Sequence, residues 1–241
     1  MSFTVENKVA LVTGANRGIG KAIVESFIKH GAKKVYLAVR NLESTKGLEQ
    51  EFGDKVTSAQ VDVSDVDSVI KLAALADDVD VVVNNAGIVV PALSLSDHAE
   101  DALVKEMDVN VYGLMRMAKA FAGILEKNGG ALVQLNSIVS IKNIAHISTY
   151  SASKAASYSI TQDLRATLGP KGVTVLSVHP GPIDTALGTE AGFDGMGSAV
   201  TVVSEGIVGA LAEGVFHLFP DDFAKHFEGG YKEYASSIIA L

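Results

Sequence analysis

KVALVTGANRGIGKAIVESFIKHG, residues 8–31, contains a short apolar run, a glycine-rich turn and a helical pattern in direct succession. The β-branched residues of 8–13 predict a buried strand. In the segment 20–31, apolar residues recur at helical spacing, and His30-Gly31 is typical of a helix C-terminus. TGANRGIG, residues 13–20, connects the two, and its glycines permit a tight turn close to another backbone. The stretch therefore predicts a strand that turns sharply into a helix.

The same alternation continues along the chain. Five further strands are predicted at 34–39, 55–61, 79–84, 130–136 and 172–178, with longer helical stretches between them. Alternating strands and helices predict an α/β fold with a doubly wound parallel sheet, helices on both faces and right-handed connections. In such sheets ligands bind outside the carboxyl ends of the strands, so the residues that follow each strand are the candidate site.

The composition narrows the function classes. A length of 241 residues without linker or repeat predicts a single domain, 1–241, and 48% hydrophobic residues predict a globular one. A net charge of −8 argues against nucleic acid or an anionic membrane as a partner. The absence of cysteine excludes disulfides and thiolate metal sites, and the six histidines show no paired ligand spacing, so no metal site is expected. The first residues lack a signal-peptide pattern and no apolar run approaches the ~18 residues of a membrane span, so we expect a cytoplasmic protein.

The glycine-rich turn favours a dinucleotide over a nucleoside triphosphate. A P-loop would require Gly at 15 or 19 and Ser or Thr at 22, where the chain has Ala15, Ile19 and Ala22. A plain strand-to-helix turn is the alternative. The glycine-rich turn follows the first strand of an alternating chain, and this position favours a dinucleotide, whose pyrophosphate would approach the backbone N–H groups.

Two arginines predict which dinucleotide binds. The second strand of such folds is often followed by an acidic residue on the ribose 2′-hydroxyl, but here Arg40 and Asn41 follow it. Arg17 lies inside the glycine-rich turn. Two guanidinium groups could bind a 2′-phosphate, which favours NADP(H), although two solvated arginines remain the alternative.

YSASK, residues 150–154, places Tyr150 and Lys154 on one face of a helix. A nearby cation favours the phenolate and lowers a tyrosine pKa from its usual ~10, so we expect a lowered pKa for Tyr150. Such a tyrosine can act as a general acid or base. A pair at this spacing also arises by chance, so its meaning depends on the other motifs.

The motifs together resemble the short-chain dehydrogenase/reductase family. TGANRGIG, NNAG (84–87), the asparagine of MDVNVYG (Asn110), NSIVS (136–140), YSASK and HPGPIDT (179–185) occur in the order and spacing of that family. The resemblance covers roughly residues 6–185. It implies a single-domain Rossmann-like fold.

The resemblance also implies catalytic roles. Tyr150 resembles the general acid/base, and Lys154 the residue that holds the nicotinamide ribose. Ser137 resembles the residue that hydrogen-bonds the substrate oxygen, with Ser140 as a rival from the same run. Asn110 resembles a residue that anchors a water on a proton path to Lys154, with a merely structural asparagine as the alternative.

The cofactor residues implied by the resemblance follow the predicted strands. Asp62 and Val63 match the pair beside the adenine, and the NNAG segment lies along the adenosine ribose, with Asn84 only bracing the sheet. The full set is Gly14, Asn16, Arg17, Gly18, Ile19, Gly20, Arg40, Asn41, Asp62, Val63, Asn85, Ala86, Gly87, Tyr150, Lys154, Pro180, Gly181, Ile183 and Thr185.

The expected substrate pocket is apolar. Its predicted residues are Ser137, Val139, Ile144, Ile147, Tyr150 and Leu187. The glycine-rich segment at about 186–203 offers no Lys or Arg and predicts a flexible substrate lid. We therefore expect small hydrophobic ketones, aldehydes and their alcohols, including bulky or aryl ones.

Three functions compete. The favoured one is an NADPH-dependent carbonyl reductase, reversible as an alcohol dehydrogenase. The second is a 3-oxoacyl-[carrier protein] reductase, which would need a basic patch such as Arg116 and Lys119 for its acidic partner. The third is a non-catalytic NADP-sensing protein, against which the intact Ser137, Tyr150 and Lys154 argue. We expect a homodimer through the surfaces of 100–125 and 150–168, while a tetramer remains open.

Overall fold

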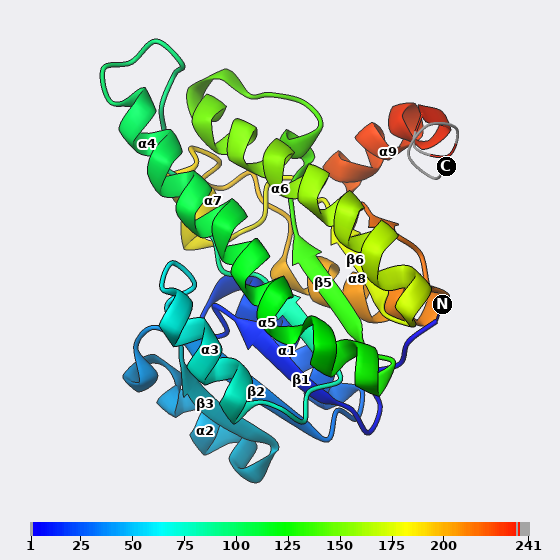
Figure 1. Cartoon of the computed structure of the whole chain (residues 1–241). Coiled ribbons are helices and arrows are strands. Elements are labelled where there is room, and N and C mark those ends of the chain that lie inside the picture. The colour runs from blue at the N-terminus through cyan, green and yellow to red at the C-terminus, as the bar shows by residue number, and fades with distance from the viewer. Residues whose placement is uncertain (1, 235, 237–241) are drawn as a thin grey trace.

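A seven-stranded sheet forms the centre of the computed structural model, which describes residues 2–234 and 236 (Figure 1). The strand order is β3–β2–β1–β4–β5–β6–β7, and every neighbouring pair is parallel. The strands are β1 Val9–Thr13, β2 Lys34–Val39, β3 Val56–Gln60, β4 Val81–Asn84, β5 Ala131–Leu135, β6 Thr174–Val178 and β7 His217–Leu218. The order reverses between β1 and β4, which is the point where doubly wound sheets open a crevice.

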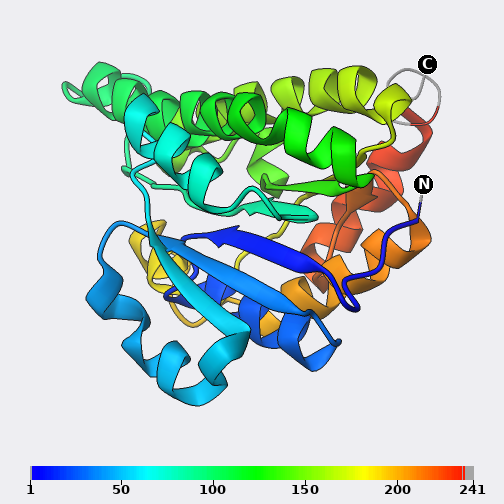
Figure 2. The ribbon, with the colours of Figure 1, turned by 60° about the horizontal axis from the view of Figure 1, so that its bottom comes forward.

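Helices cover both faces of the sheet (Figure 2). One face carries α1 Gly18–Lys29, α2 Lys46–Phe52 and α8 Val200–Glu213, and the other carries α3 Val66–Leu75, α5 Gly113–Asn128 and α6 Ser148–Leu168. Helix α4 Ala99–Glu106 runs through a π-helical turn, Met107–Tyr112, into α5. The five-residue α7 Ala186–Glu190 and the 13-residue α9 Asp222–Tyr234 complete the fold. The chain is thus a single Rossmann-like α/β domain, as the sequence predicted.

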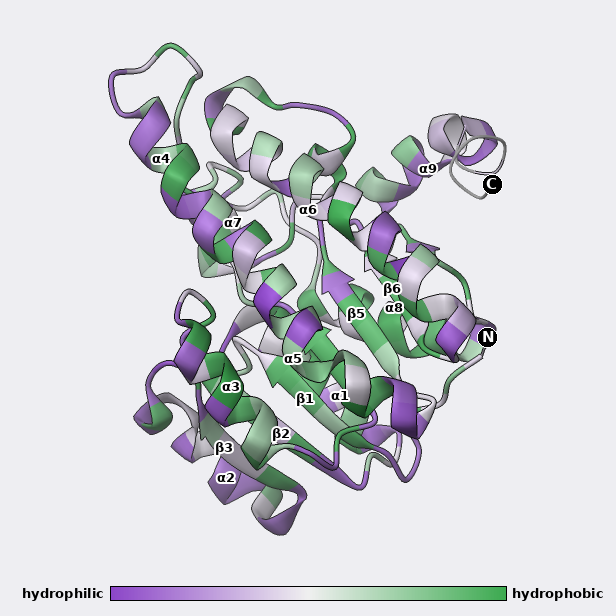
Figure 3. Cartoon of the chain, viewed as in Figure 1, coloured by the Kyte–Doolittle hydropathy of each residue, from purple (hydrophilic) through white to green (hydrophobic). Residues whose placement is uncertain are grey.

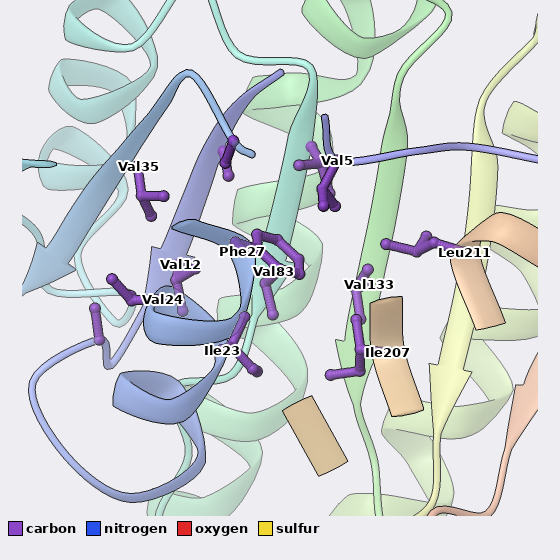
Figure 4. Packing of buried hydrophobic residues seen from close by; sticks show 14 of the residues in the cluster. Val5, Val12, Ile23, Val24, Phe27, Val35, Val83, Val133, Ile207 and Leu211 are labelled. Carbon is purple, nitrogen blue, oxygen red and sulfur yellow. The ribbon is translucent and has the colours of Figure 1, made fainter. Parts of the chain in front are cut away.

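The inner strands β1, β2, β4, β5 and β6 are mainly apolar because helices bury both of their faces, whereas the edge strand β3 is partly exposed and more polar (Figure 3). Along β1, Ala10 and Val12 face the layer of α1 and α8, whereas Val9 and Leu11 face the layer of α3 and α5. Figure 4 shows the first of these clusters, in which Phe27 of α1 packs among strand valines. The period-two alternation of a strand therefore distributes its side chains into two separate cores.

Six strands lie where the sequence predicted them, with ends that differ by one or two residues. The predicted strands at 130–136 and 172–178 began at glycines, but Gly172 has φ +90° and the strand starts at Thr174. The two-residue β7 was not predicted, because two residues are too few to show the alternation of a strand.

The segment expected to be an unstructured lid, 186–203, contains more regular structure than predicted. Its first five residues form α7, and its last four form the start of α8. Val203 is 0% exposed in the core, so this end is fixed by packing. The irregular part is confined to 191–199, where Gly192 and Gly195 have positive φ.

We predict that Gly20→Ala lowers the free energy of unfolding by about 1–3 kcal/mol, because it overpacks a tight junction. A Cβ at Gly20 would overlap the Gly14 carbonyl oxygen and lie 2.6 Å from Asn85 Nδ2. Gly47→Ala in α2 is the matched control, since nothing lies within 4 Å of its Cβ, and it should stabilise by about 0.4–1 kcal/mol. Urea unfolding of both variants tests this, and equal effects would contradict it.

Candidate active site

A cleft with a volume of about 660 Å³ runs along the carboxyl ends of strands β1 to β5. It begins at the glycine-rich turn between β1 and α1. Gly14 and Gly18 have φ of +66° and +52°, which favours glycine at both positions. A Cβ at Gly18 would lie 3.0 Å from Thr185 Cγ2, across the cleft. Glycine at these positions therefore leaves the backbone of the turn without side chains where Thr185 and Asn85 come close.

Hydrogen bonds hold the turn to the end of β4. Thr13 Oγ1 accepts the backbone N–H groups of Asn85 and Ala86, each at 2.9 Å. Asn85 Nδ2 donates to the Thr13 carbonyl at 2.8 Å. Asn84 donates to Gln134 of β5 at 2.7 Å, so it braces the sheet.

Two arginines line one end of the cleft. Arg17 is the residue before α1, Arg40 follows β2, and both line the cleft with Asn41 and Ser44. Asp62, after β3, also lines it. Hydrogen bonds from Ser64 hold the pKa of Asp62 below its usual value, and Arg40 adds to this. This end combines two cations with hydroxyl and amide groups, a donor set that suits a phosphate.

A nicotinamide dinucleotide fits these residues. The cleft is long enough to continue from the arginines to Tyr150 and Lys154 at its other end. Gly87 has no side chain, and a Cβ added there would lie 3.2 Å from Asn110 Oδ1 and 3.8 Å from Lys154 Nζ. Side chains at Gly14, Gly18 and Gly87 would narrow the cleft at three points.

The candidate catalytic side chains come from α6 and from the turn after β5. Tyr150 and Lys154 lie in α6, are 8% and 4% exposed, and share a face as their spacing predicts. Lys154 Nζ donates to the Leu135 carbonyl at 2.7 Å and lies 5.7 Å from the Tyr150 ring centroid. Ser137 lies two residues after β5, and its Oγ donates to the Pro180 carbonyl at 3.3 Å. Ser140 lines neither the cleft nor the adjoining pocket, and its hydroxyl bonds the Ser137 carbonyl and His179 instead.

The lowered pKa expected for Tyr150 is wrong for this structure. Burial raises the pKa of Tyr150, and the carboxyl of Glu106 raises it further. Burial also lowers the pKa of Lys154 to about 8. Both shifts favour the neutral forms, because removing a charge from water costs more than the pair regains at this separation.

Asn110 lies in the π-helical turn and is 2% exposed. Its Oδ1 accepts Ile88 N–H at 2.9 Å, while Nδ2 donates to the Ile88 carbonyl and to Ser153 Oγ, each at 3.0 Å. The side chain thus ties the segment after β4 to α6. It reaches the neighbourhood of Lys154 across Gly87 rather than bonding to it.

A second, apolar pocket of about 90 Å³ adjoins the cleft at Tyr150. All the predicted substrate residues line it: Ser137, Val139, Ile144, Ile147, Tyr150 and Leu187. Ala191 and Phe193 of the irregular segment also line it. His146 Nε2–H donates to the Ala191 carbonyl at 2.9 Å and its ring packs on Phe193, which holds this segment over the pocket.

Every predicted cofactor residue lines the cleft except Gly181 and Ile183, which line the apolar pocket. The predicted site residues lacked Ser44 and Asp184 of the cleft, whereas Ala191 and Phe193 lie in the segment predicted as a lid but were not predicted individually. Ser44 lies three residues beyond Asn41 and its hydroxyl was the available signal. Nothing in the sequence singled out Phe193, whose position depends on how 191–199 folds back.

Residues 2–234 and 236 contain no helix with the length and apolar character needed to cross a membrane. Within the same residues, no group of three or more His, Asp or Glu side chains is arranged to hold a metal ion.

Comparisons with known proteins agree with this geometry. Residues 8–194 match the family described as short chain dehydrogenase. An uncharacterised oxidoreductase of Staphylococcus aureus strain USA300 is 37% identical over 187 residues, which cover 75% of this chain and 80% of that protein. A short chain dehydrogenase from Burkholderia cenocepacia, solved in complex with NADP, superposes with a TM-score of 0.89 at 33% identity over 99% and 98% of the two chains. A 3-ketoacyl-(acyl-carrier-protein) reductase from Brucella melitensis, complexed with NADH, gives 0.79 at 26% identity over 89% and 97%.

Proposed function

The chain belongs to the short-chain dehydrogenase/reductase family, and from that premise we propose that it reduces ketones and aldehydes with NADPH and oxidises the alcohols in reverse. An oxidoreductase acting on CH–OH and C=O groups with a nicotinamide cofactor is what family membership establishes. The observation that supports the finer proposal is that one continuous cleft joins two arginines at one end to Tyr150, Lys154 and an apolar pocket at the other.

NADP(H) is the proposed cofactor. Arg17 and Arg40 would hold the 2′-phosphate, with Ser44 as a further hydroxyl donor. The Burkholderia cenocepacia complex with NADP supports this assignment, whereas the Brucella melitensis complex holds NADH. When bound, the cofactor supplies the hydride.

The residues of this chain supply the proton and the geometry. Tyr150, protonated because it is buried, would donate its proton to the carbonyl oxygen in reduction and accept it in oxidation. Ser137, beside it in the same pocket, would donate a hydrogen bond to that oxygen. Lys154 would orient the ribose and stabilise the phenolate, and Asn110 would lie on the proton path behind it.

The substrate class follows from the pocket. Its lining is apolar apart from Ser137, Tyr150, Thr185 and Asn136, and no Lys, Arg or acidic residue of the described chain lines it. Its volume of about 90 Å³ is below the roughly 300–1,000 Å³ of most ligand pockets. Compact apolar substituents are therefore proposed, and bulky or aryl groups would need Leu187, Ala191 and Phe193 to move as a lid.

The 3-oxoacyl-[carrier protein] alternative is favoured by the Brucella melitensis relative but not by the surface. Arg116, expected to form a basic patch, bonds Asp108 Oδ1 at 2.8 Å and the carbonyls of Val63 and Asp108. A non-catalytic role has no support, because Tyr150 lines the cleft together with Lys154 and the adjoining pocket together with Ser137.

A homodimer is also proposed. Exposed apolar side chains on the predicted surface around α4 and α5 include Val104, Tyr112 and Met115. Burying them against a second copy would remove apolar area from water.

A substrate panel tests the proposed function. We expect higher kcat/KM for neutral ketones than for matched keto acids, because a carboxylate would find no counter-charge in the pocket. Extension by one buried methylene should gain at most about 0.8 kcal/mol until the pocket is full. A preference for keto acids would contradict the pocket assignment, and a preference for 3-oxoacyl thioesters would support the carrier-protein alternative.

We predict that Arg40→Asp shifts preference from NADPH towards NADH. Losing a charge-assisted contact to the 2′-phosphate should cost about 1.5–3 kcal/mol, or roughly ten- to a hundredfold in affinity. Lys33→Asp is the control, since Lys33 is exposed before the other end of β2. Equal kcat/KM for both cofactors in the unmodified protein would refute the NADPH assignment.

Tyr150→Phe should lower kcat by about 10²–10⁴-fold while leaving folding and cofactor binding intact, because it removes only the hydroxyl. Tyr158→Phe on the same helix is the control, since Tyr158 bonds His217 and Tyr231 outside the cleft. Steady-state kinetics and cofactor titration give both readouts. Retention of more than about a tenth of the activity by Tyr150→Phe would identify another proton donor.

A further inference from the structure

The side chain of His146 contacts three successive residues of the irregular segment 191–199. Its Nε2 lies 2.9 Å from the Ala191 carbonyl oxygen, so this nitrogen carries a proton and donates it. The ring centroids of His146 and Phe193 are 5.5 Å apart. A Cβ at Gly192, between these two contacts, would lie 3.3 Å from His146 Nε2, and Gly192 has φ +84°. The glycine therefore lets the segment lie directly against the histidine ring.

The backbone that carries His146 is held in place. His146 belongs to the short 3-10 turn Ala145–Ile147, directly before α6. Ile147 is 1% exposed and packs in an apolar cluster. The next residue, Ser148, donates from its backbone N–H and from its hydroxyl to the Ala92 carbonyl, at 3.0 and 3.2 Å. Burial and hydrogen bonds therefore fix the turn, whereas His146 itself is exposed.

Both ends of the stretch 189–196 are also fixed. After it, the Ser198 N–H donates to the Pro182 carbonyl and the Ser198 carbonyl accepts the Asp184 N–H, each at 2.9 Å. Before it, Thr185 caps the N-terminus of α7 with its hydroxyl, whose oxygen accepts a backbone N–H at 3.0 Å. Any movement of the segment over the pocket therefore takes place between these two anchored ends.

The bond from His146 is the one that ties 189–196 to another part of the site. In the described part of the chain, every other hydrogen bond of this stretch stays within 185–196. Apolar packing also holds it, because Ala191 is 4% exposed and Phe193 packs on the cluster of pocket residues. An apolar substrate replaces such apolar contacts, but it offers no donor to the Ala191 carbonyl. The hydrogen bond is therefore the contact that opposes opening.

We propose that His146 is a specificity-determining residue: by donating to the Ala191 carbonyl it holds Phe193 over the pocket and limits the size of the carbonyl substrate. This inference rests on the proposed function, which places the substrate in this pocket. While the bond is made, the volume of about 90 Å³ admits compact substituents. Bulky and aryl ketones bind only when the bond is broken, and they bind more weakly for that reason.

A thiol probe tests the role of His146 without any substrate. The chain has no cysteine, so Ala191→Cys introduces a single thiol and keeps the carbonyl that accepts the bond. Ala191 is 4% exposed, so a chromogenic disulfide reagent reaches this thiol only when the segment opens. Adding His146→Ala should make the reaction about three- to tenfold faster, the factor expected for one lost hydrogen bond.

Three further variants, each combined with Ala191→Cys, show which contact matters. His98→Ala is the matched control, because His98 Nε2 also donates to a backbone carbonyl, that of Pro91 at 3.1 Å, but lines neither pocket. His146→Gln keeps a donor, and His146→Phe keeps a ring without a donor. We expect a faster reaction for His146→Phe and a nearly unchanged one for His146→Gln and His98→Ala. A faster reaction for His146→Gln than for His146→Phe would overturn the proposal, because the ring alone would then hold the segment.

Substrate size provides the second readout, measured in proteins that keep Ala191. The ratio of kcat/KM for acetophenone, an aryl ketone, to that for butanone, a compact one, should rise about three- to tenfold in His146→Ala and His146→Phe. The ratio should stay constant in His98→Ala. The KM for NADPH should not change in any variant, because His146 does not line the cofactor cleft. An unchanged ratio in His146→Ala would overturn the assignment of specificity to this residue.

The two readouts separate this inference from the proposed function. A protein that reduces neither ketone would refute the proposed function, while the thiol rates would still decide the role of His146. A faster thiol reaction in His146→Ala would then uphold the finding that this residue holds the segment over the pocket. An unchanged thiol rate would overturn the inference whatever the activity. Since His146 is exposed, its replacement leaves the packed core of the protein intact.

Discussion

Close backbone contact where β1 and β4 part is the constraint on which the rest of the site depends. Gly20 leaves no room for a side chain beside the Gly14 carbonyl and Asn85, and Thr13 binds two backbone N–H groups of the opposite segment. Because these contacts replace water, the ends of two strands are held together while their onward chains diverge. The cleft opens where the chains diverge, and the turn after β1 and the segment after β4 line it.

A buried polar network fixes the other side of the cleft. Ser157 donates to Asn136 Oδ1 at 2.8 Å, and Asn136 Nδ2 donates to Thr161 at 3.2 Å, which ties α6 to the end of β5. Ser153 Oγ accepts a hydrogen bond from Asn110 Nδ2 in the π-helical turn between α4 and α5. Such a network stabilises only when its members are satisfied, so it specifies one position of the helix. That position sets the burial of Tyr150 and Lys154, and burial rather than their mutual attraction dominates their protonation.

The sequence predicted the parallel sheet, six strands, the glycine-rich turn and many of the residues that line the cleft. These predictions were possible because the periodicity of a strand and the need for glycine in a tight turn depend on residues close together in the sequence. Parallel strands also bring their carboxyl ends to one edge of the sheet, where the cleft lies. It failed for β7, whose two residues have no periodicity, and for the end of the expected lid, where Val203 is held by the core. It also gave the wrong direction for the Tyr150 pKa.

What the sequence by itself determined is the order of the elements and the chemical groups at their ends, since both depend on neighbours along the chain. Only the tertiary structure decided the electrostatics. The spacing of Tyr150 and Lys154 was visible in the sequence, but their burial was not. The energy of a charge depends on how much water it loses and which groups surround it, and those quantities exist only after the chain has folded.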